Sequence, residues 1–261
     1  MALSDVILCS FGAAGRANRS GCVGCCPVDL QDQLKHEVAA AAAQLVKPGM
    51  TLGLGSGSTA ALFVESVGRR VKSGELAGVR GVPTSFQAEV LAVQHGVPFA
   101  TLNEIDRIDL AVDGADEVAP NLDLTKGGGG CHTEEKLVDA WADELVIVVD
   151  DSKLVSKLGE KMPIPVEVLP DTFRQVTERL ERIGGKPELR MAVRKAGPVI
   201  TDQGNFLIDT TFAPIDNPGE LEKELNNMPG VLDVGLFVGL ADKILIGEVR
   251  DGKPHVREMT K

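Results

Sequence analysis

Residues 108–153, IDLAVDGADEVAPNLDLTKGGGGCHTEEKLVDAWADELVIVVDDSK, decide the fold of this chain. They predict two short strands that each run into a polar or glycine-rich loop, over 108–118 and 122–130. A helix over 133–144 and a buried strand over 144–153 follow. Glycine loses more backbone freedom on folding than any other residue, so the four consecutive glycines indicate that something must approach the backbone closely there.

The alternation of strand and helix extends toward the N-terminus. Helices are predicted over 30–46, 58–74 and 84–96, and strands over 50–55, 78–83 and 97–102. Strands that alternate with helices indicate parallel βαβ units. We therefore predict an α/β fold, a doubly wound and mostly parallel Rossmann-like sheet, formed by residues 29–160 and 236–261.

The pattern changes after residue 160. Strands are predicted over 165–169, 188–193, 206–212 and 231–237, with helices over 171–185 and 219–228. This βαββαβ order is typical of a ferredoxin-like fold. Residues 161–235 are thus predicted to form a smaller α+β domain inserted into the first, because 243–249 predicts a strand that returns to the main sheet.

Composition narrows the function classes. The chain has 261 residues, 43% of them hydrophobic, and its 38 acidic against 27 basic residues give a net charge of −11. This balance argues against nucleic acid or anionic lipid as a partner, because neutralised phosphates supply most of that affinity. No apolar run reaches the length of a membrane span. A phosphate-bearing substrate would need lysines inside its own pocket.

Residues 1–28 differ from the rest and contain four of the five cysteines, Cys9, Cys22, Cys25 and Cys26. A closed zinc site usually needs a second pair of ligands downstream, and none follows, so we predict no metal there. The segment is interpreted as a disordered or targeting extension. The odd cysteine count favours a reducing compartment, so we predict a cytoplasmic protein, or an organellar one if this segment is a transit peptide.

Four loops end predicted strands: 53–60, 113–117, 126–130 and 150–153. In open α/β sheets, ligands bind outside the carboxyl ends of the strands. The first loop, GLGSGSTA, is a plausible anion cradle, with bare backbone N–H groups and the hydroxyls of Ser56, Ser58 and Thr59. It matches neither a Walker nor a dinucleotide pattern. By itself it is equally well an ordinary strand-to-helix turn in which Ser58 or Thr59 caps the helix.

The other loops carry carboxylates and a lysine. Two carboxylates three residues apart, Asp113 and Asp116, can exchange protons with a polyol or orient a lysine, although acidic turns are often merely solvated. Lys126 can hold a developing oxyanion, and a nearby carboxylate can move a proton on carbon. Two glutamates, at 134 and 135, are candidates, and the residues alone do not choose between them. If Thr133 caps the helix, both are simple first-turn acids.

The motifs GSGST, DGADE, KGGGG followed by TEEK, and DDSK, in this order and spacing, resemble the type A ribose-5-phosphate isomerase family. VEVLP, GGKPELR, PGV and GLF extend the resemblance over about residues 31–249. The resemblance implies reversible interconversion of ribose 5-phosphate and ribulose 5-phosphate in the pentose phosphate pathway, without metal or cofactor. It implies a sugar phosphate as the partner molecule, and we expect a homodimer or homotetramer.

The resemblance also implies the site residues. Glu135 corresponds to the catalytic base, and a base working near neutral pH is expected to be partly buried. Lys126 would steady the oxyanion, Asp113 would help to move hydroxyl protons or open the sugar ring, and Asp116 would hold Lys126 or bind hydroxyls. The implied substrate-binding residues are Ser56, Gly57, Ser58, Thr59, Asp113, Gly114, Ala115, Asp116, Lys126, Gly127, Gly128, Gly129 and Lys153, with Lys35 as a further phosphate contact.

Two other functions use the same kind of site. A sugar-phosphate-sensing domain of a transcription regulator would bind without turnover, but it should carry a basic helix-turn-helix segment, against which the acidic balance argues. An amino-sugar phosphate isomerase or deaminase would favour a histidine near the sugar ring, and none lies in the matched loops. His132, at a position usually small or apolar in the family, is the departure that adjoins these loops.

Overall fold

The computed structural model describes residues 30–261, so the predictions for residues 1–28 lie outside the described residues. Its main sheet has six strands in the order β13-β12-β6-β3-β1-β2. Neighbouring strands from β12 to β2 are parallel, and β13 pairs antiparallel with β12. The strands are β1 Thr51–Leu54, β2 Arg80–Pro83, β3 Leu110–Asp113, β6 Leu145–Asp150, β12 Lys243–Arg250 and β13 Lys253–Thr260.

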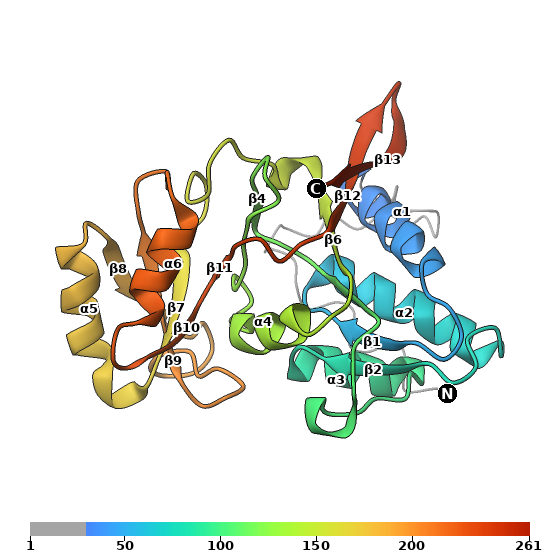
Figure 1. Cartoon of the computed structure of the whole chain (residues 1–261), viewed down its shortest axis with the longest axis horizontal. Helices are drawn as coiled ribbons and strands as arrows, with labels where there is room; N and C mark the ends of the chain where they lie inside the picture. Colours follow the sequence, from blue (N-terminus) through green and yellow to red (C-terminus); the bar gives the residue numbers. More distant parts are fainter. Residues whose placement is uncertain (1–29) are drawn as a thin grey trace, which may run out of the picture.

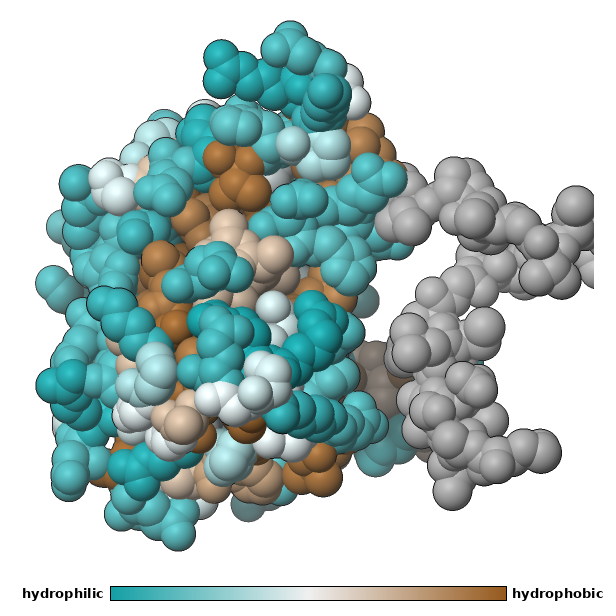
Figure 2. Space-filling model, turned by 90° about the vertical axis from the view of Figure 1, so that its right-hand side faces the viewer, coloured by the Kyte–Doolittle hydropathy of each residue, from teal (hydrophilic) through white to brown (hydrophobic). Residues whose placement is uncertain are grey.

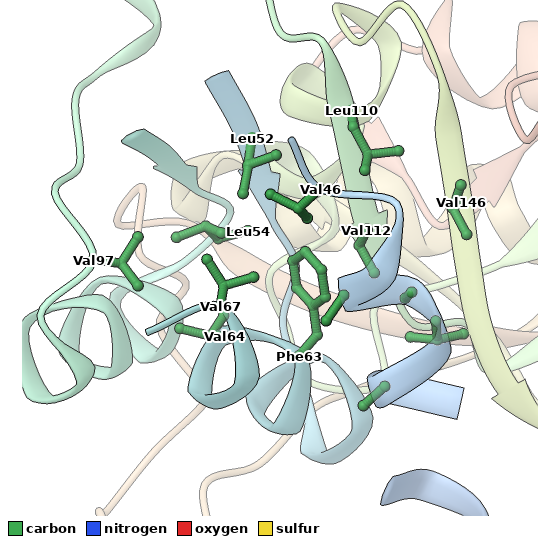
Figure 3. Close-up of a cluster of buried hydrophobic side chains, with 14 of the residues drawn as sticks. Val46, Leu52, Leu54, Phe63, Val64, Val67, Val97, Leu110, Val112 and Val146 are labelled. Carbon is green, nitrogen blue, oxygen red and sulfur yellow. The ribbon is translucent and has the colours of Figure 1, made fainter. Parts of the chain in front are cut away.

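Helices α1 Leu30–Gln44, α2 Ser58–Lys72 and α3 Phe86–His95 cover one face of this sheet. Figure 3 shows the core between them, in which Phe63 of α2 packs against side chains from β1 and β3. Phe63 is fully buried, and burial of a side chain of this size contributes about 1.5–3 kcal/mol.

The central strand β6 shows why both faces must be covered. Val146 and Val148 join the first core, whereas Leu145, Ile147 and Val149 join a second core on the opposite face. Because successive side chains of a strand point to opposite faces, an entirely apolar strand is stable only between two layers.

The second face is covered by helix α4 His132–Ala140 and by a small sheet in the order β11-β5-β4. Its strands are β4 Glu117–Val118, β5 Leu124–Thr125 and β11 Leu236–Phe237. In Figure 1 this layer lies in the middle of the molecule, between the main sheet and the smaller unit.

The smaller unit is an antiparallel sheet in the order β10-β7-β9-β8, with two helices packed on it. Its elements are β7 Ile164–Val168, α5 Phe173–Arg182, β8 Lys186–Leu189, β9 Phe206–Thr211, α6 Pro218–Asn226 and β10 Val231–Val234. This order confirms the α/β fold with an inserted ferredoxin-like unit, here called the small domain. The exact limits of the two domains, at residues 160 and 236, stay a proposal. Short 3₁₀ helices occur at η2 Leu102–Glu104, η3 Asp151–Lys153 and η4 Pro170–Thr172.

The prediction of a strand over 97–102 is wrong. The chain touches the sheet there only through the bridge between Gly81 and Phe99. It then turns into η2, because the backbone N–H of Thr101 donates to the Glu104 carboxylate at 2.8 Å. This capping box competes with further strand pairing.

Two further differences concern the C-terminal part. The strand predicted over 231–237 is divided at Gly235 between two sheets, and a Cβ at this glycine would lie 2.2 Å from the carbonyl oxygen of Lys126. Strand β13 was not predicted from the sequence. Asp251 and Gly252 both have positive φ, 53° and 73°, which makes the tight hairpin turn that an Asp-Gly pair favours.

None of the helices among residues 30–261 combines the length and the apolar composition needed to cross a membrane. Figure 2 shows one face of the molecule, on which hydrophilic side chains cover much of the surface and hydrophobic ones emerge in separate patches. Scattered apolar side chains are normal on a folded surface.

Candidate active site

The loops that follow β1, β3 and β6 meet at one edge of the main sheet, as parallel strands require. The fourth loop, 126–130, also follows a strand as predicted, but this strand is β5 of the small sheet and not a strand of the main sheet. The pairing of β5 with β4 turns this loop back over the one after β3, where the N–H of Asp116 donates to the carbonyl of Thr125 at 2.8 Å. All four loops therefore border one cavity.

This cavity has a volume of about 490 Å³, enough for a small phosphorylated sugar. Twelve of the thirteen predicted substrate-binding residues line it, and so does Lys35. The twelve are Ser56, Gly57, Ser58, Thr59, Gly114, Ala115, Asp116, Lys126, Gly127, Gly128, Gly129 and Lys153. Asp113, the thirteenth, lies fully buried directly behind Lys126.

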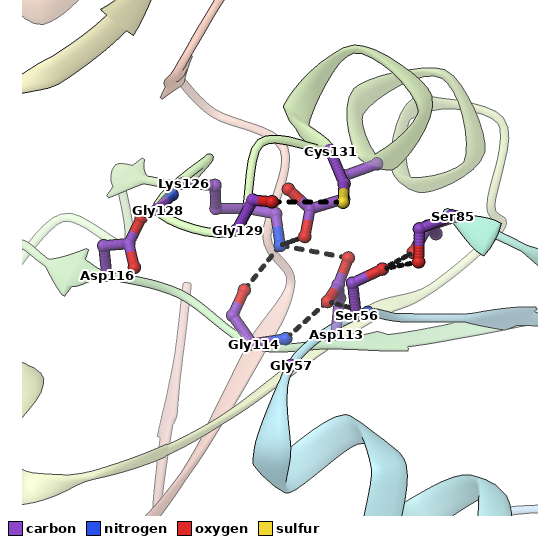
Figure 4. Close-up of polar contacts among 12 residues, drawn as sticks. Ser56, Gly57, Ser85, Asp113, Gly114, Asp116, Lys126, Gly128, Gly129 and Cys131 are labelled. Atoms are coloured by element: carbon purple, nitrogen blue, oxygen red, sulfur yellow. Dashed lines mark hydrogen bonds and ion pairs between the residues drawn. The ribbon is translucent and has the colours of Figure 1, made fainter. Parts of the chain in front are cut away.

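A buried charge cluster forms around Lys126 (Figure 4). Its ammonium lies 3.0 Å from Asp113 Oδ2 and 3.3 Å from Glu135 Oε1, and it donates to the carbonyl of Gly114 at 2.6 Å. The Lys126 side chain is 1% exposed and that of Glu135 is 8% exposed. A charge this deep is tolerated only when it is paired and hydrogen-bonded. The structure thus brings together three of the four predicted catalytic residues.

The cluster shifts the pKa of both partners. Burial opposes the charge of Lys126, but the carboxylates of Asp113, Glu135 and Asp139 outweigh it and raise the Lys126 pKa above its usual value. Burial raises the pKa of Glu135 to about 8, although the Lys126 ammonium acts in the opposite direction. The expected burial of Glu135 is therefore present, and its pKa lies near neutral pH, as suits a proton-transferring group.

The fourth predicted catalytic residue, Asp116, does not pair with Lys126. Its carboxylate accepts from the backbone N–H of Gly128 at 2.7 Å, and a Cβ at Gly128 would lie 2.7 Å from Asp116 Oδ1. Gly127 has a φ of 99° and packs on His132. The glycines thus let the loop lie close to two neighbouring side chains, while a Cβ at Gly129 would meet nothing within 4 Å.

Residues at the start of α3 and just before it hold the loop after β1 in place. The hydroxyl of Ser56 bonds to those of Thr84 and Ser85, and the N–H of Gly57 donates to the Gln87 side chain at 3.0 Å. Gly57 itself is the N-cap of α2, with a φ of 96°. These contacts fix the loop at the start of a helix, which is a favourable place for an anion.

No side chain caps α2, so the prediction that Ser58 or Thr59 caps it is wrong. Both residues line the cavity instead. They begin α2 and line the same cavity as Lys35 and Lys153.

Comparisons with known proteins agree on one family. The sequence profile described as ribose 5-phosphate isomerase A (phosphoriboisomerase A) matches residues 80–251. A protein from Synechococcus named ribose-5-phosphate isomerase A is 60% identical over 231 residues, which is 88% of this chain and all of that protein. A relative of the same name from Thermosynechococcus vestitus is 54% identical over 88% of this chain and 98% of its own length. The chain belongs to the ribose 5-phosphate isomerase A family.

Solved structures of this family superpose on the chain. The ribose 5-phosphate isomerase A of Methanocaldococcus jannaschii has a TM-score of 0.83 and 52% identity, over 88% of this chain and all of that one. A D-ribose-5-phosphate isomerase in complex with phospho-erythronic acid has a TM-score of 0.85 and 44% identity, over 88% of this chain and 99% of its own. The matches confirm the fold and the family resemblance inferred from the motifs.

Within this isomerase A fold, the structure separates the two candidate glutamates. Glu135 lines the cavity and pairs with Lys126. Glu134 instead accepts a hydrogen bond from the side chain of Gln203 in the small domain, at 3.1 Å. Burial raises the pKa of Glu134 as well, but this residue does not line the cavity. The alternative in which Thr133 caps α4 does not hold, because its hydroxyl donates to the buried Glu167 carboxylate.

Besides Asp150, which belongs to the predicted loop 150–153, the cavity of this family member contains residues that were not predicted to line it: Gln31, Gln87, Cys131, Val148, Val149 and Asp202. Gln87 lies in the first turn of α3, which follows β2, so the strand-end rule would have found it as well. Asp202 comes from the small domain, and no local pattern signals it. Burial raises the pKa of Cys131 to about 12, so its thiol stays protonated at neutral pH.

Proposed function

We propose that this chain interconverts D-ribose 5-phosphate and D-ribulose 5-phosphate in the non-oxidative branch of the pentose phosphate pathway. The observation that carries the proposal is the Lys126 ammonium, held between Asp113 and Glu135 at the wall of the cavity. An aldose–ketose isomerase needs a base that removes a proton from carbon and a cation beside the oxygen that becomes negative. The family and the complex of a structural relative with phospho-erythronic acid support the same reaction.

The reaction follows from moving two protons. In the open-chain aldose, Glu135 removes the proton on C2, and the electron pair of that bond forms the C1–C2 double bond while negative charge develops on O1. The Lys126 ammonium neutralises this charge. Asp113 assists the transfer of the hydroxyl proton from O2 to O1, and Glu135 returns its proton to C1. Asp113 also assists the opening of the sugar ring, and Asp116, which lines the cavity, binds hydroxyl groups of the substrate.

The phosphate is assigned to the N-terminus of α2. Ser56, Ser58 and Thr59 offer hydroxyls there, and Lys35 and Lys153 line the same cavity. These two lysines supply the local positive charge that a chain with a net charge of −11 needs in order to bind a phosphate dianion. Because Lys126 provides the cation next to the reacting oxygens, the proposed mechanism requires no metal ion.

A coupled isomerase assay with EDTA present tests this function. The parent protein should turn over ribose 5-phosphate at an unchanged rate when EDTA is added. Glu135→Gln should keep substrate affinity but lose about 10²–10⁴-fold in kcat, as expected for loss of a general base. A Glu135→Gln variant within a few-fold of the parent would rule out the assignment of the base.

We propose in addition that the protein is a cytoplasmic homodimer or homotetramer. Phe86, Val90 and Val93 form an exposed apolar row on α3, with Phe86 62% exposed, and Trp141 next to α4 is 69% exposed. An exposed row of large apolar side chains is typical of an interface. Light scattering should give a mass of two or four chains, and a monomer at micromolar concentration would contradict the proposal.

A further inference from the structure

The first turn of α4, which carries Glu135, is attached almost entirely to the small domain. His132 Nε2 lies 3.2 Å from the carbonyl of Asp233, and Thr133, Glu134 and Lys136 also bond to small-domain residues. Glu135 pairs toward the main domain, with Lys126, and the Lys136 ammonium also lies 5.0 Å from the centroid of the Phe237 ring in β11. Figure 1 shows α4 lying between the two units.

One of these attachments is a fully buried carboxylate. Glu167 on β7 is 0% exposed, and it accepts hydrogen bonds from the hydroxyls of Thr133 and Thr201 and from the side-chain amide of Asn205. A buried carboxylate is costly unless several donors satisfy it. This one therefore fixes α4 and the turn at residues 201–205 at the same point.

The other attachment is formed by the ion pairs of Lys136, the residue that follows Glu135 in α4. The Lys136 ammonium lies 2.8 Å from Asp233 Oδ1 and 3.0 Å from Glu222 Oε1, and it donates to the carbonyl of Val234 at 2.7 Å. All three side chains are less than a quarter exposed, so this pairing is only weakly screened by solvent.

We propose that the small domain sets the position of Glu135, with Glu167 and Asp233 as positioning residues that act through Thr133 and Lys136. The inference rests on the proposed role of Glu135 as the base. No side chain caps the N-terminus of α4, and the helix has only nine residues, so its orientation depends on these contacts. A displacement of about 1 Å in a reacting group can cost about 100-fold in rate, which gives the contacts a kinetic consequence.

Thr133→Val and Thr201→Val are a matched pair for the test, because each removes one hydroxyl from the same carboxylate. Thr201 also accepts from the N–H of Asn205 at 3.0 Å, so Thr201→Val should destabilise the fold at least as much. We expect Thr133→Val to lower kcat about tenfold with KM within about twofold. Thr201→Val should keep kcat within about twofold of the parent. Equal kcat values in the two variants, or a loss confined to KM, would overturn the proposal.

Lys136→Met is the second variant, and it keeps the inference testable if Thr133→Val fails to fold. It breaks the contacts with Asp233 and Glu222, and it should also lower kcat while KM is retained. A parent-like kcat in Lys136→Met would overturn the part of the proposal that concerns Asp233. Glu135→Gln distinguishes a failure of the proposed base from a failure of the positioning role. If Glu135→Gln remains active, Glu135 is not the base. If Glu135→Gln is inactive but Thr133→Val has a parent-like kcat, only the positioning role is refuted.

Discussion

Replacing Lys126 by methionine should impair both stability and catalysis, in amounts set by its surroundings. The variant keeps the length of the side chain but leaves Asp113 and Glu135, 3.0 and 3.3 Å from the lost ammonium, without their counter-charge in a buried site. Removing one partner of a buried pair costs about 3–5 kcal/mol in the free energy of unfolding. Loss of the group that neutralises the oxyanion should lower kcat by about 10²–10³-fold.

The stability loss should depend on pH in a definite direction. In the parent, the Lys126 ammonium partly opposes the effect of burial on the Glu135 pKa. In Lys126→Met this ammonium is gone, so the Glu135 pKa should rise further. A carboxyl whose folded pKa is raised stabilises the folded state when it is protonated, and this contribution is lost as the pH rises through the folded value. The parent loses this contribution up to its Glu135 pKa of about 8, whereas the variant keeps losing it at higher pH. The difference from the parent should therefore be larger at pH 9 than at pH 5, as measured by urea unfolding.

Lys157→Met is the control for the same chemical change. Lys157 pairs with Asp216 at the surface, where the two side chains are 53% and 84% exposed, so the change should leave the free energy of unfolding and kcat nearly unchanged. A Lys126→Met variant with kcat within tenfold of the parent, or with the same loss of stability at both pH values, would contradict these expectations.

Three further predictions follow from the same site. In the parent, kcat should rise with pH and level off above about pH 8, because Glu135, with its pKa raised to about 8, must be ionised to accept a proton; a rate that is flat from pH 6 to 9 would contradict this. Gly55→Ala should disrupt the site, because the added Cβ would lie 2.3 Å from Asp113 Oδ1. Gly219→Ala in α6 is the matched control, because its added Cβ would lie 3.6 Å from the nearest atom; it should leave kcat unchanged and leave Tm unchanged or slightly higher. Lys153→Met should raise KM and weaken inhibition by inorganic phosphate about tenfold or more while kcat changes little; unchanged inhibition would remove Lys153 from the phosphate site.

Much of the site could be predicted because its residues lie at strand ends. Asp113 ends β3, and the loop after β1 starts α2, so a single rule about parallel sheets placed them together. The apolar run over 145–149 likewise required two covering layers. Both inferences depend on local pattern and one general packing rule.

What the sequence did not reveal depends on contacts between distant segments. Thr133 has the residue type and position of a helix cap, but its hydroxyl instead donates a hydrogen bond to the carboxylate of Glu167, 34 residues away. The choice between Glu134 and Glu135 required knowing which side of α4 faces Lys126. Local propensity contains no information on such pairings, because tertiary contacts decide them. The hairpin at Asp251 and Gly252 is different, since its turn signal was present in the sequence and was overlooked.

The most direct test of the account follows the hydrogen on C2. Ribose 5-phosphate that carries deuterium at C2 is given to the parent and to Glu135→Gln, and the rate at which deuterium leaves C2 is measured by NMR, whatever its destination. We expect rapid loss of deuterium with the parent and loss at least about 100-fold slower with the variant. Equal rates in the two proteins would show that another group removes this hydrogen.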